Sequence, residues 1–245
     1  MRIEAIGNAT LYLGDCLEVM AGLSSIDVVI TDPPYCSGSV SESSRTAAKG
    51  QGLRSESIAK LGWFVGDNMG TAGLVHLLRS VAFRSLEILN PEGSLLAFCD
   101  WRMVPSLAPA IESAGMRYQN MIVWDKGSMG LGMGFRAQHE IILHYTAGSP
   151  KYHDLGTSNV IKVGRVSAND REHQTQKPAE LLSRLARVVT PPGGTILDPF
   201  MGSGSMGVAA QSDGFKFIGI ERSPQHFETA CRRIEDAQRQ GRLIA

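Results

Sequence analysis

The segment Thr31-Asp32-Pro33-Pro34-Tyr35 places several chemically useful groups at the end of an apolar run. The run, residues 26–30, is typical of a buried strand. Asp32 supplies a carboxylate acceptor, and the two prolines lack an N–H and have a fixed φ, so the turn is stiff and its carbonyls project outward as acceptors. Tyr35 offers a flat face for stacking. These residues predict a site that binds the amino group of a planar substrate through Asp32 and the Pro33 carbonyl.

A strand can also end in Asp-Pro-Pro for purely structural reasons, because prolines are common in turns. A second motif favours the chemical interpretation. The apolar run 194–197 ends in Asp198, and a glycine-rich turn, residues 199–205, leads into an expected helix. Such a turn lets the backbone approach a cofactor closely and directs helix N-terminal N–H groups toward it.

The next expected strand, residues 216–220, is followed by Glu221. An acidic residue at this place in a Rossmann-like unit binds the ribose hydroxyls of a cofactor. A solvated strand end would explain Glu221 alone, but its spacing from the glycine-rich turn favours the ribose-binding role.

The motifs TDPPY and DPFMGSG, in this order, resemble those of the β group of amino-methylating DNA methyltransferases, and the resemblance covers nearly the whole chain. In the α group the glycine motif comes first. Three further segments are similar to family motifs: Leu11 to Cys16, His173 to Pro178, and Phe217 to Glu221. The chain departs from the family where Gly204-Ser205-Met206 replaces the usual Gly-Thr-Thr.

The resemblance implies an α/β fold: a Rossmann-like S-adenosylmethionine-dependent methyltransferase sheet with circularly permuted motif order and short target-recognition loops. It implies that the catalytic residues are Asp32, Pro33, Pro34 and Tyr35. It also implies a set of residues that bind S-adenosylmethionine: Asp15, Cys16, Lys177, Pro178, Asp198, Pro199, Phe200, Gly202, Ser203, Gly204, Ser205 and Glu221.

Individual roles follow from the same resemblance. Asp198 and the backbone of residues 200–204 are expected to hold the methionine end of the cofactor, whose carboxylate Ser203 or Ser205 would reach. Glu221 would accept the ribose hydroxyls, and Asp15 the adenine amino group. Lys177 and Pro178 would close over the cofactor.

The implied activity is methylation of the exocyclic N6 of adenine in duplex DNA, with the target base flipped out and stacked on Tyr35. Asp at the first position of the tetrapeptide is more often associated with adenine in this family, and Ser with cytosine. Cytosine-N4 methylation is the alternative. A third hypothesis is a catalytically silent DNA-binding regulator on the same fold, which the intact Asp32 to Tyr35 motif disfavours.

Net charge is zero, with 24 basic and 24 acidic residues, so contacts with phosphates must come from local clusters. We expect these clusters in two target-recognition segments, residues 36–70 and 147–173, with residues 127–134 as a further glycine-rich loop. The candidate DNA-binding residues are Arg45, Lys49, Arg54, Arg136, Lys162, Arg165 and Arg171.

At 245 residues and 43% hydrophobic content, the chain suits a single methyltransferase domain, residues 1–245. The four cysteines lack C-x-x-C spacing, and we expect no metal site. We find no signal peptide or membrane span, and expect a cytoplasmic protein. The family resemblance and the short recognition segments suggest a homodimer on palindromic DNA, within a restriction-modification system.

Alternation of short apolar runs with helical patterns predicts a mostly parallel, doubly wound sheet. Strands are expected at residues 10–13, 27–31, 94–99, 118–124, 140–145, 195–197 and 216–220. Helices are expected at residues 16–21, 71–89, 104–113, 178–189, 205–212 and 224–240. In such a sheet Asp15, Asp32, Asp198 and Glu221 all fall at the carboxyl ends of strands, where binding sites form.

Overall fold

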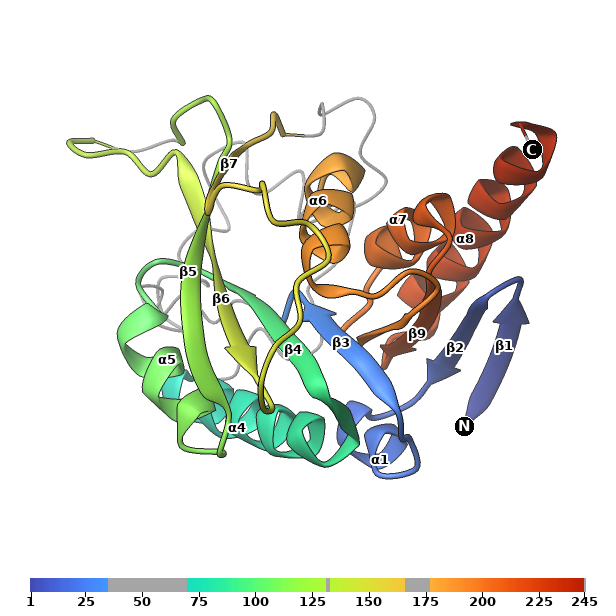
Figure 1. The fold of residues 1–245 in the computed structure, drawn as a ribbon, viewed down its shortest axis with the longest axis horizontal. Helices are drawn as coiled ribbons and strands as arrows, with labels where there is room; N and C mark the ends of the chain where they lie inside the picture. The colour runs from blue at the N-terminus through green and yellow to red at the C-terminus, as the bar shows by residue number, and fades with distance from the viewer. Residues whose placement is uncertain (35–69, 131–132, 166–176, 245) are drawn as a thin grey trace, which may run out of the picture.

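The computed structural model describes residues 1–34, 70–130, 133–165 and 177–244. Within these residues, helices cover both faces of a nine-stranded sheet (Figure 1). The strands are β1 (Arg2–Ile6), β2 (Ala9–Leu13), β3 (Ile26–Thr31), β4 (Leu89–Cys99), β5 (Arg117–Asp125), β6 (His139–Thr146), β7 (Val160–Lys162), β8 (Thr195–Asp198) and β9 (Lys216–Glu221). The helices are α1 (Cys16–Met20), α4 (Thr71–Ile88), α5 (Val104–Glu112), α6 (Ala179–Val189), α7 (Ser205–Asp213) and α8 (Pro224–Ile244).

The strand order is β1-β2-β9-β8-β3-β4-β6-β5-β7. The strands from β2 to β4 in this order run parallel, so their carboxyl ends meet at one edge, which we call the carboxyl edge. β6 runs antiparallel to both β4 and β5, and β5 therefore ends at the carboxyl edge as well. The expected mostly parallel α/β sheet is confirmed.

Successive side chains of β3 pack on opposite faces of the sheet, which explains why its central residues, Val28 to Ile30, are all apolar. Val28 and Ile30 belong to the core formed with α6, α7 and α8. Val29 belongs to the core formed with α1, α4 and α5. Figure 1 shows these two groups of helices on opposite sides of the sheet. Full burial of one such side chain contributes about 1.5–3 kcal/mol to stability, so the two layers hold Asp32 on a rigid strand.

Two strands were not expected from the sequence, and the largest difference in a strand boundary is at the start of β4. β1 and β7 were not expected, because β1 is a largely exposed edge strand and β7 has only three residues. β4 begins at Leu89 rather than at residue 94, so the segment from Asn90 to Gly93 lies in the strand. The pairing of β4 with β3 is irregular there, with a shift of register between Ile26 and Val28. The Asn-Pro pair follows Leu89, the C-cap of α4.

The two expected target-recognition segments are only partly visible. Residues 36–69 and 166–173 lie outside the described residues, and the described part of the second segment, residues 147–165, contains β7. The single-domain organisation stays a prediction. In the described part of the chain, no helix is both long and apolar enough to cross a membrane.

Candidate active site

Four acidic residues lie next to one another along the carboxyl edge. Their spatial order follows the strands: Asp15 after β2, Glu221 at the end of β9, Asp198 at the end of β8, and Asp32 after β3. The sequence order is different, so the arrangement depends on the permuted sheet. The predicted convergence of these four residues on one edge is confirmed.

Asp32 emerges from β3 with its side chain half-buried, and Pro33 behind it is buried. Lys177 Nζ donates a hydrogen bond of 2.5 Å to Asp32 Oδ2. Lys177 was expected to close over the cofactor, but in the structure its ammonium contacts the Asp32 carboxylate. Tyr35 lies outside the described residues, so its stacking role stays a prediction.

Lys177 is only 6% exposed and lies between two carboxylates. Its Nζ is 3.3 Å from Glu140 Oε2 as well as 2.5 Å from Asp32 Oδ2. Burial alone would lower the pKa of Lys177, but the charges of Asp32 and Glu140 outweigh burial and raise it. Lys177 is therefore a cation at neutral pH, and its ammonium also lies 5.1 Å from the centre of the Phe98 ring.

Asp198 is a buried carboxyl group at the end of β8. Its Oδ1 accepts hydrogen bonds from Thr31 Oγ1 at 2.9 Å and from the Phe200 backbone N–H at 3.1 Å. Burial, together with the smaller effects of the Asp32 and Glu221 charges, raises the pKa of Asp198 to about 7. A buried acid of this kind would be stabilised in its charged form by a cation placed beside it.

Glu221 holds the glycine-rich turn at the end of the neighbouring strand. Its Oε2 accepts a hydrogen bond of 3.0 Å from the Gly202 N–H, and its Oε1 one of 2.7 Å from the Ser223 N–H. Each carboxylate oxygen has two acceptor positions, so these bonds leave capacity for ribose hydroxyls.

Arg233 of α8 supports the other side of this turn. Its Nη1 lies 2.7 Å from the Ser203 carbonyl oxygen, 2.9 Å from Ser203 Oγ and 3.4 Å from Ser205 Oγ. Both hydroxyls predicted to reach the cofactor thus contact a guanidinium of the protein. Gly204 has φ of +80°, and a Cβ there would approach Ala230 Cα to 3.1 Å. Glycine at this position therefore permits close packing of the turn against α8.

The other expected cofactor residues surround these groups. Asp15 is the N-cap of α1, where its Oδ1 accepts from the Leu17 N–H at 2.9 Å. Cys16 is buried, and burial with the Asp15 charge raises the pKa of its thiol to about 12. Pro178 is the buried N-cap of α6, Pro199 is buried, and Phe200 packs on the core beside α1, α4 and α5. Their contacts with a cofactor stay predictions.

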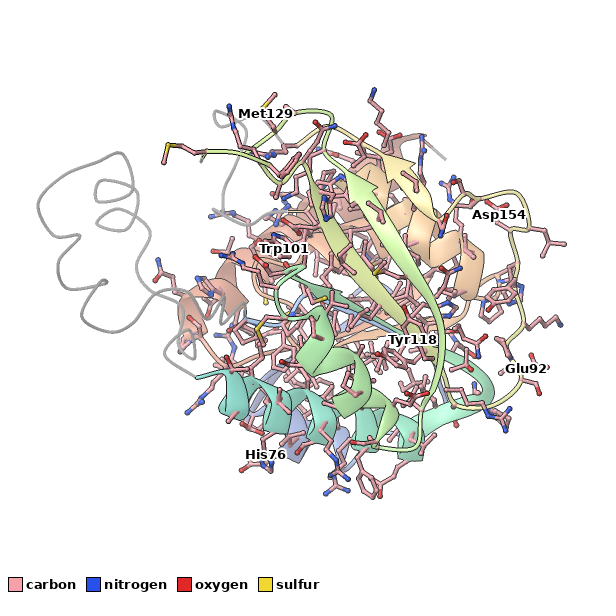
Figure 2. All side chains as sticks on the ribbon, turned by 90° about the vertical axis from the view of Figure 1, so that its left-hand side faces the viewer. His76, Glu92, Trp101, Tyr118, Met129 and Asp154 are labelled. Carbon is pink, nitrogen blue, oxygen red and sulfur yellow. The ribbon has the colours of Figure 1, made fainter. Side chains whose placement is uncertain are left out.

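Three of the candidate DNA-binding residues are exposed beside the connection from β5 to β6. Arg136 Nε donates to the Gly130 carbonyl at 2.7 Å, Arg165 donates to the Ser128 carbonyl at 3.2 Å, and Lys162 ends β7. β7 is parallel to β5 and thus ends at the carboxyl edge. Figure 2 shows the labelled Met129 on the projecting part of this connection. Arg45, Lys49, Arg54 and Arg171 lie outside the described residues.

Four residues that hold the site were assigned no role from the sequence: Thr31, which was named only as part of its motif, and Lys126, Glu140 and Arg233. Lys126 Nζ contacts Glu140 Oε1 at 2.6 Å, which connects Glu140 to a second cation. In the sequence, Glu140 stands out only as a charged residue at the start of an apolar strand. That pattern does not show that its partners are Lys126 and Lys177. Among the described residues, no three His, Cys, Asp or Glu side chains are grouped to hold a metal ion.

Comparison with known proteins decides which family has this site. The profile of the DNA methylase family matches residues 26–232, which span β3 to α8. The chain belongs to the DNA methylase family. Among its relatives, the type II methyltransferase M2.DpnII of Streptococcus pneumoniae is 28% identical over 235 residues, covering 86% of this chain and 83% of the relative.

Solved structures show the same fold for this DNA methylase. The crystal structure of the M1.HpyAVI–SAM complex has a TM-score of 0.69 at 23% identity, covering 92% of this chain and 98% of the other. The cytosine-N4-specific PvuII DNA methyltransferase has a TM-score of 0.72 at 18% identity, covering 97% and 93%. The predicted family of amino-methylating DNA methyltransferases, its fold and its dependence on S-adenosylmethionine are confirmed.

Proposed function

We propose that this DNA methylase transfers a methyl group to the exocyclic N6 of adenine in duplex DNA. The observation that carries the proposal is Asp32, a carboxylate at the first position of its tetrapeptide, held by Lys177 at 2.5 Å. The lone pair of an exocyclic amine is delocalised into the ring, and such an amine is a poor nucleophile. A fixed carboxylate that accepts its N–H orients the amine and stabilises the positive charge that develops during transfer.

Residues at the neighbouring strand ends fit the cofactor. S-adenosylmethionine, when bound, supplies an activated methyl group on a positively charged sulfur. The buried carboxyl of Asp198 is suited to a positively charged ligand group, because a cation would favour its ionised form. Glu221 has acceptor capacity for hydroxyls beside the turn that it holds. We therefore assign the methionine end to Asp198 and the turn, and the ribose to Glu221.

The ionisation of Lys177 limits its part in the reaction. Because Asp32 and Glu140 raise its pKa, the ammonium stays protonated and is not a base for the amine proton. Lys177 instead presents a positive charge to Asp32. The Asp32 carboxylate and the Pro33 carbonyl are left as the groups that receive the amine, and Tyr35 as the stacking partner.

The target base is tested by incubating the full chain with duplex DNA and S-adenosylmethionine carrying an isotopically labelled methyl group. The DNA is then hydrolysed to nucleosides and analysed by mass spectrometry. We expect label in N6-methyladenine. Label in N4-methylcytosine would assign the enzyme to the alternative base. Specific DNA binding without any label would identify a non-catalytic DNA-binding protein.

The DNA is expected to approach the carboxyl edge, where Asp32 lies. Lys162, Arg165 and Arg136 border this edge and supply local positive charge in a chain of zero net charge. We also propose that the enzyme acts as a homodimer. Sedimentation velocity with and without a duplex carrying the methylated site would measure its oligomeric state.

A further inference from the structure

Four charged side chains of alternating sign lie in a row that ends at Asp32. Lys126 Nζ is 2.6 Å from Glu140 Oε1, Glu140 Oε2 is 3.3 Å from Lys177 Nζ, and Lys177 Nζ is 2.5 Å from Asp32 Oδ2. They come from four separate segments: the residue after β5, strand β6, the residue before the N-cap of α6, and the residue after β3. The row crosses the carboxyl edge from the β5–β6 connection to the catalytic carboxylate.

Glu140 is the member through which both lysines are connected. Its side chain is 19% exposed and contacts Lys126 and Lys177 with different oxygens. Burial opposes its ionisation, but the charges of Lys177 and Lys126 outweigh burial and lower its pKa. Glu140 is therefore an anion at neutral pH, and it draws part of the Lys177 charge away from Asp32.

Sharing of Lys177 has a chemical consequence. An ammonium bound to one carboxylate alone would neutralise that carboxylate strongly and compete with a substrate amine for its oxygens. An ammonium held between two carboxylates fixes the orientation of each and leaves more negative charge on both. Asp32 needs both properties, because it must stay oriented and must still attract an amine N–H.

We propose that Glu140 is a positioning residue for methyl transfer, which holds Lys177 so that Asp32 is oriented but not neutralised. Lys126 supports this role of Glu140, because its positive charge contacts the other carboxylate oxygen of Glu140. The inference rests on the proposed role of Asp32 in binding the target amine. It adds a function to β6, a strand that carries no cofactor or target motif.

The test compares Glu140→Gln with Lys177→Met in the full chain. Glu140→Gln keeps the shape and an acceptor but removes the negative charge, so Lys177 should bind Asp32 more tightly. We expect kcat to fall about tenfold while the KM for DNA and the Kd for S-adenosylmethionine stay within about twofold. Glu140→Asp should recover part of kcat. Glu87→Gln is the control, because Glu87 forms a similar ion pair with Arg84 at 2.8 Å on the outer face of α4.

The pH dependence of kcat/KM for DNA distinguishes positioning from a merely structural role. In a plot of kcat/KM against pH, the acidic limb is the part that falls as the pH is lowered. Glu140→Gln should move this acidic limb to lower pH and Lys177→Met should move it to higher pH, because the two changes have opposite effects on the ionised form of Asp32. Among the described residues, the charged groups that interact with Asp32 include Lys177 and, from β8, Asp198, and Glu140 acts on it through Lys177. Asp198 is common to all variants, so shifts relative to the wild type are compared.

Lys126→Met provides a second test if Glu140→Gln folds poorly. It removes the Lys126 cation from Glu140, so Glu140 should attract the Lys177 ammonium more strongly, draw it from Asp32 and move the acidic limb to higher pH. Wild-type kcat and an unchanged acidic limb in the variants would overturn the inference. The inference would also be overturned if kcat fell only in parallel with thermal stability and cofactor affinity while the acidic limb of the pH profile did not move. Failure of the wild type to methylate an amine would instead overturn the proposed function.

Discussion

Thr31 Oγ1 donates a hydrogen bond of 2.9 Å to Asp198 Oδ1 and thereby joins the ends of β3 and β8. Thr31 immediately precedes Asp32, so the bond connects the strand that leads to the proposed target-binding carboxylate with the strand that carries the proposed cofactor-binding carboxylate. Both residues are buried. The two halves of the site therefore share one rigid contact.

Thr31→Val should weaken cofactor binding about tenfold at pH 8, because it removes a donor from a buried carboxylate without changing side-chain shape. A hydrogen bond to a charged group contributes about 1.5–3 kcal/mol. Isothermal calorimetry with S-adenosylmethionine measures the effect. Thr31→Ser should stay near wild type, as should Thr229→Val, which changes a partly exposed threonine on α8. Equal affinities for Thr31→Val and wild type would contradict a role for this bond.

Asp198 should make the stability of the cofactor-free protein depend on pH. Its pKa is raised from an ordinary value of 3.8 to about 7, so the folded state favours the neutral form. Its stabilising contribution is complete below about pH 4 and is lost as the pH rises through about 7. Urea unfolding at several pH values should show this decline in wild type and a flatter profile in Asp198→Asn.

Cofactor binding should have the opposite pH dependence, because a positively charged ligand favours ionised Asp198. The affinity for S-adenosylmethionine should fall as the pH is lowered below about 7, and binding near pH 6.5 should release protons. Calorimetry in two buffers with different ionisation enthalpies measures the release. Proton release that is unchanged in Asp198→Asn would show that another group is responsible.

Asp32→Ala should abolish methylation and leave the Kd for S-adenosylmethionine within a few-fold, because the cofactor turn does not depend on the Asp32 side chain. Asp198→Ala and Glu221→Ala should instead raise the Kd for S-adenosylmethionine. Calorimetry and single-turnover methylation on the same three variants separate the roles. An Asp32→Ala enzyme with wild-type rate would refute the catalytic assignment.

Arg233→Met should weaken cofactor binding by about tenfold, because it removes the guanidinium that holds the Ser203 carbonyl and the Ser203 and Ser205 hydroxyls. The apolar part of the side chain is retained, so α8 should still pack. Arg239→Met is a matched control on the same helix, where Arg239 forms an exposed pair with Glu235. If both variants bind S-adenosylmethionine alike, Arg233 does not organise the turn.

Neutralising Lys162, Arg165 or Arg136 should distinguish phosphate contacts from base contacts. Loss of a phosphate contact weakens binding to all sequences and reduces the salt dependence by about one unit per contact, whereas loss of a base contact relaxes specificity at one position. Fluorescence anisotropy at several salt concentrations measures both. Lys151→Gln serves as control, because Lys151 lies beside Pro91 and Glu92 near the amino end of β4. Three variants that match this control would place recognition elsewhere.

The sequence by itself was enough to predict the central strands, the glycine-rich turn and the four acidic strand ends. These features are encoded locally: a buried strand needs a continuous apolar run, and the residue that ends it is its covalent neighbour. Asp32 and Asp198 could be assigned to one edge because parallel strands share a carboxyl edge. The weakly patterned strands β1 and β7 at the sheet margins escaped prediction because few of their side chains are buried.

Only the tertiary structure decided which side chains hold the site together. Lys177 and Asp32 are 145 positions apart, and Arg233 reaches Ser203 across 30 positions. Such contacts depend on strand order and on the packing of α8 against the turn, which no local pattern encodes. The antiparallel β6 is the clearest case: it brings Glu140 to the same edge as Lys177 and Asp32. The residue types showed the chemistry, whereas the sheet topology determined the partners of each charged group.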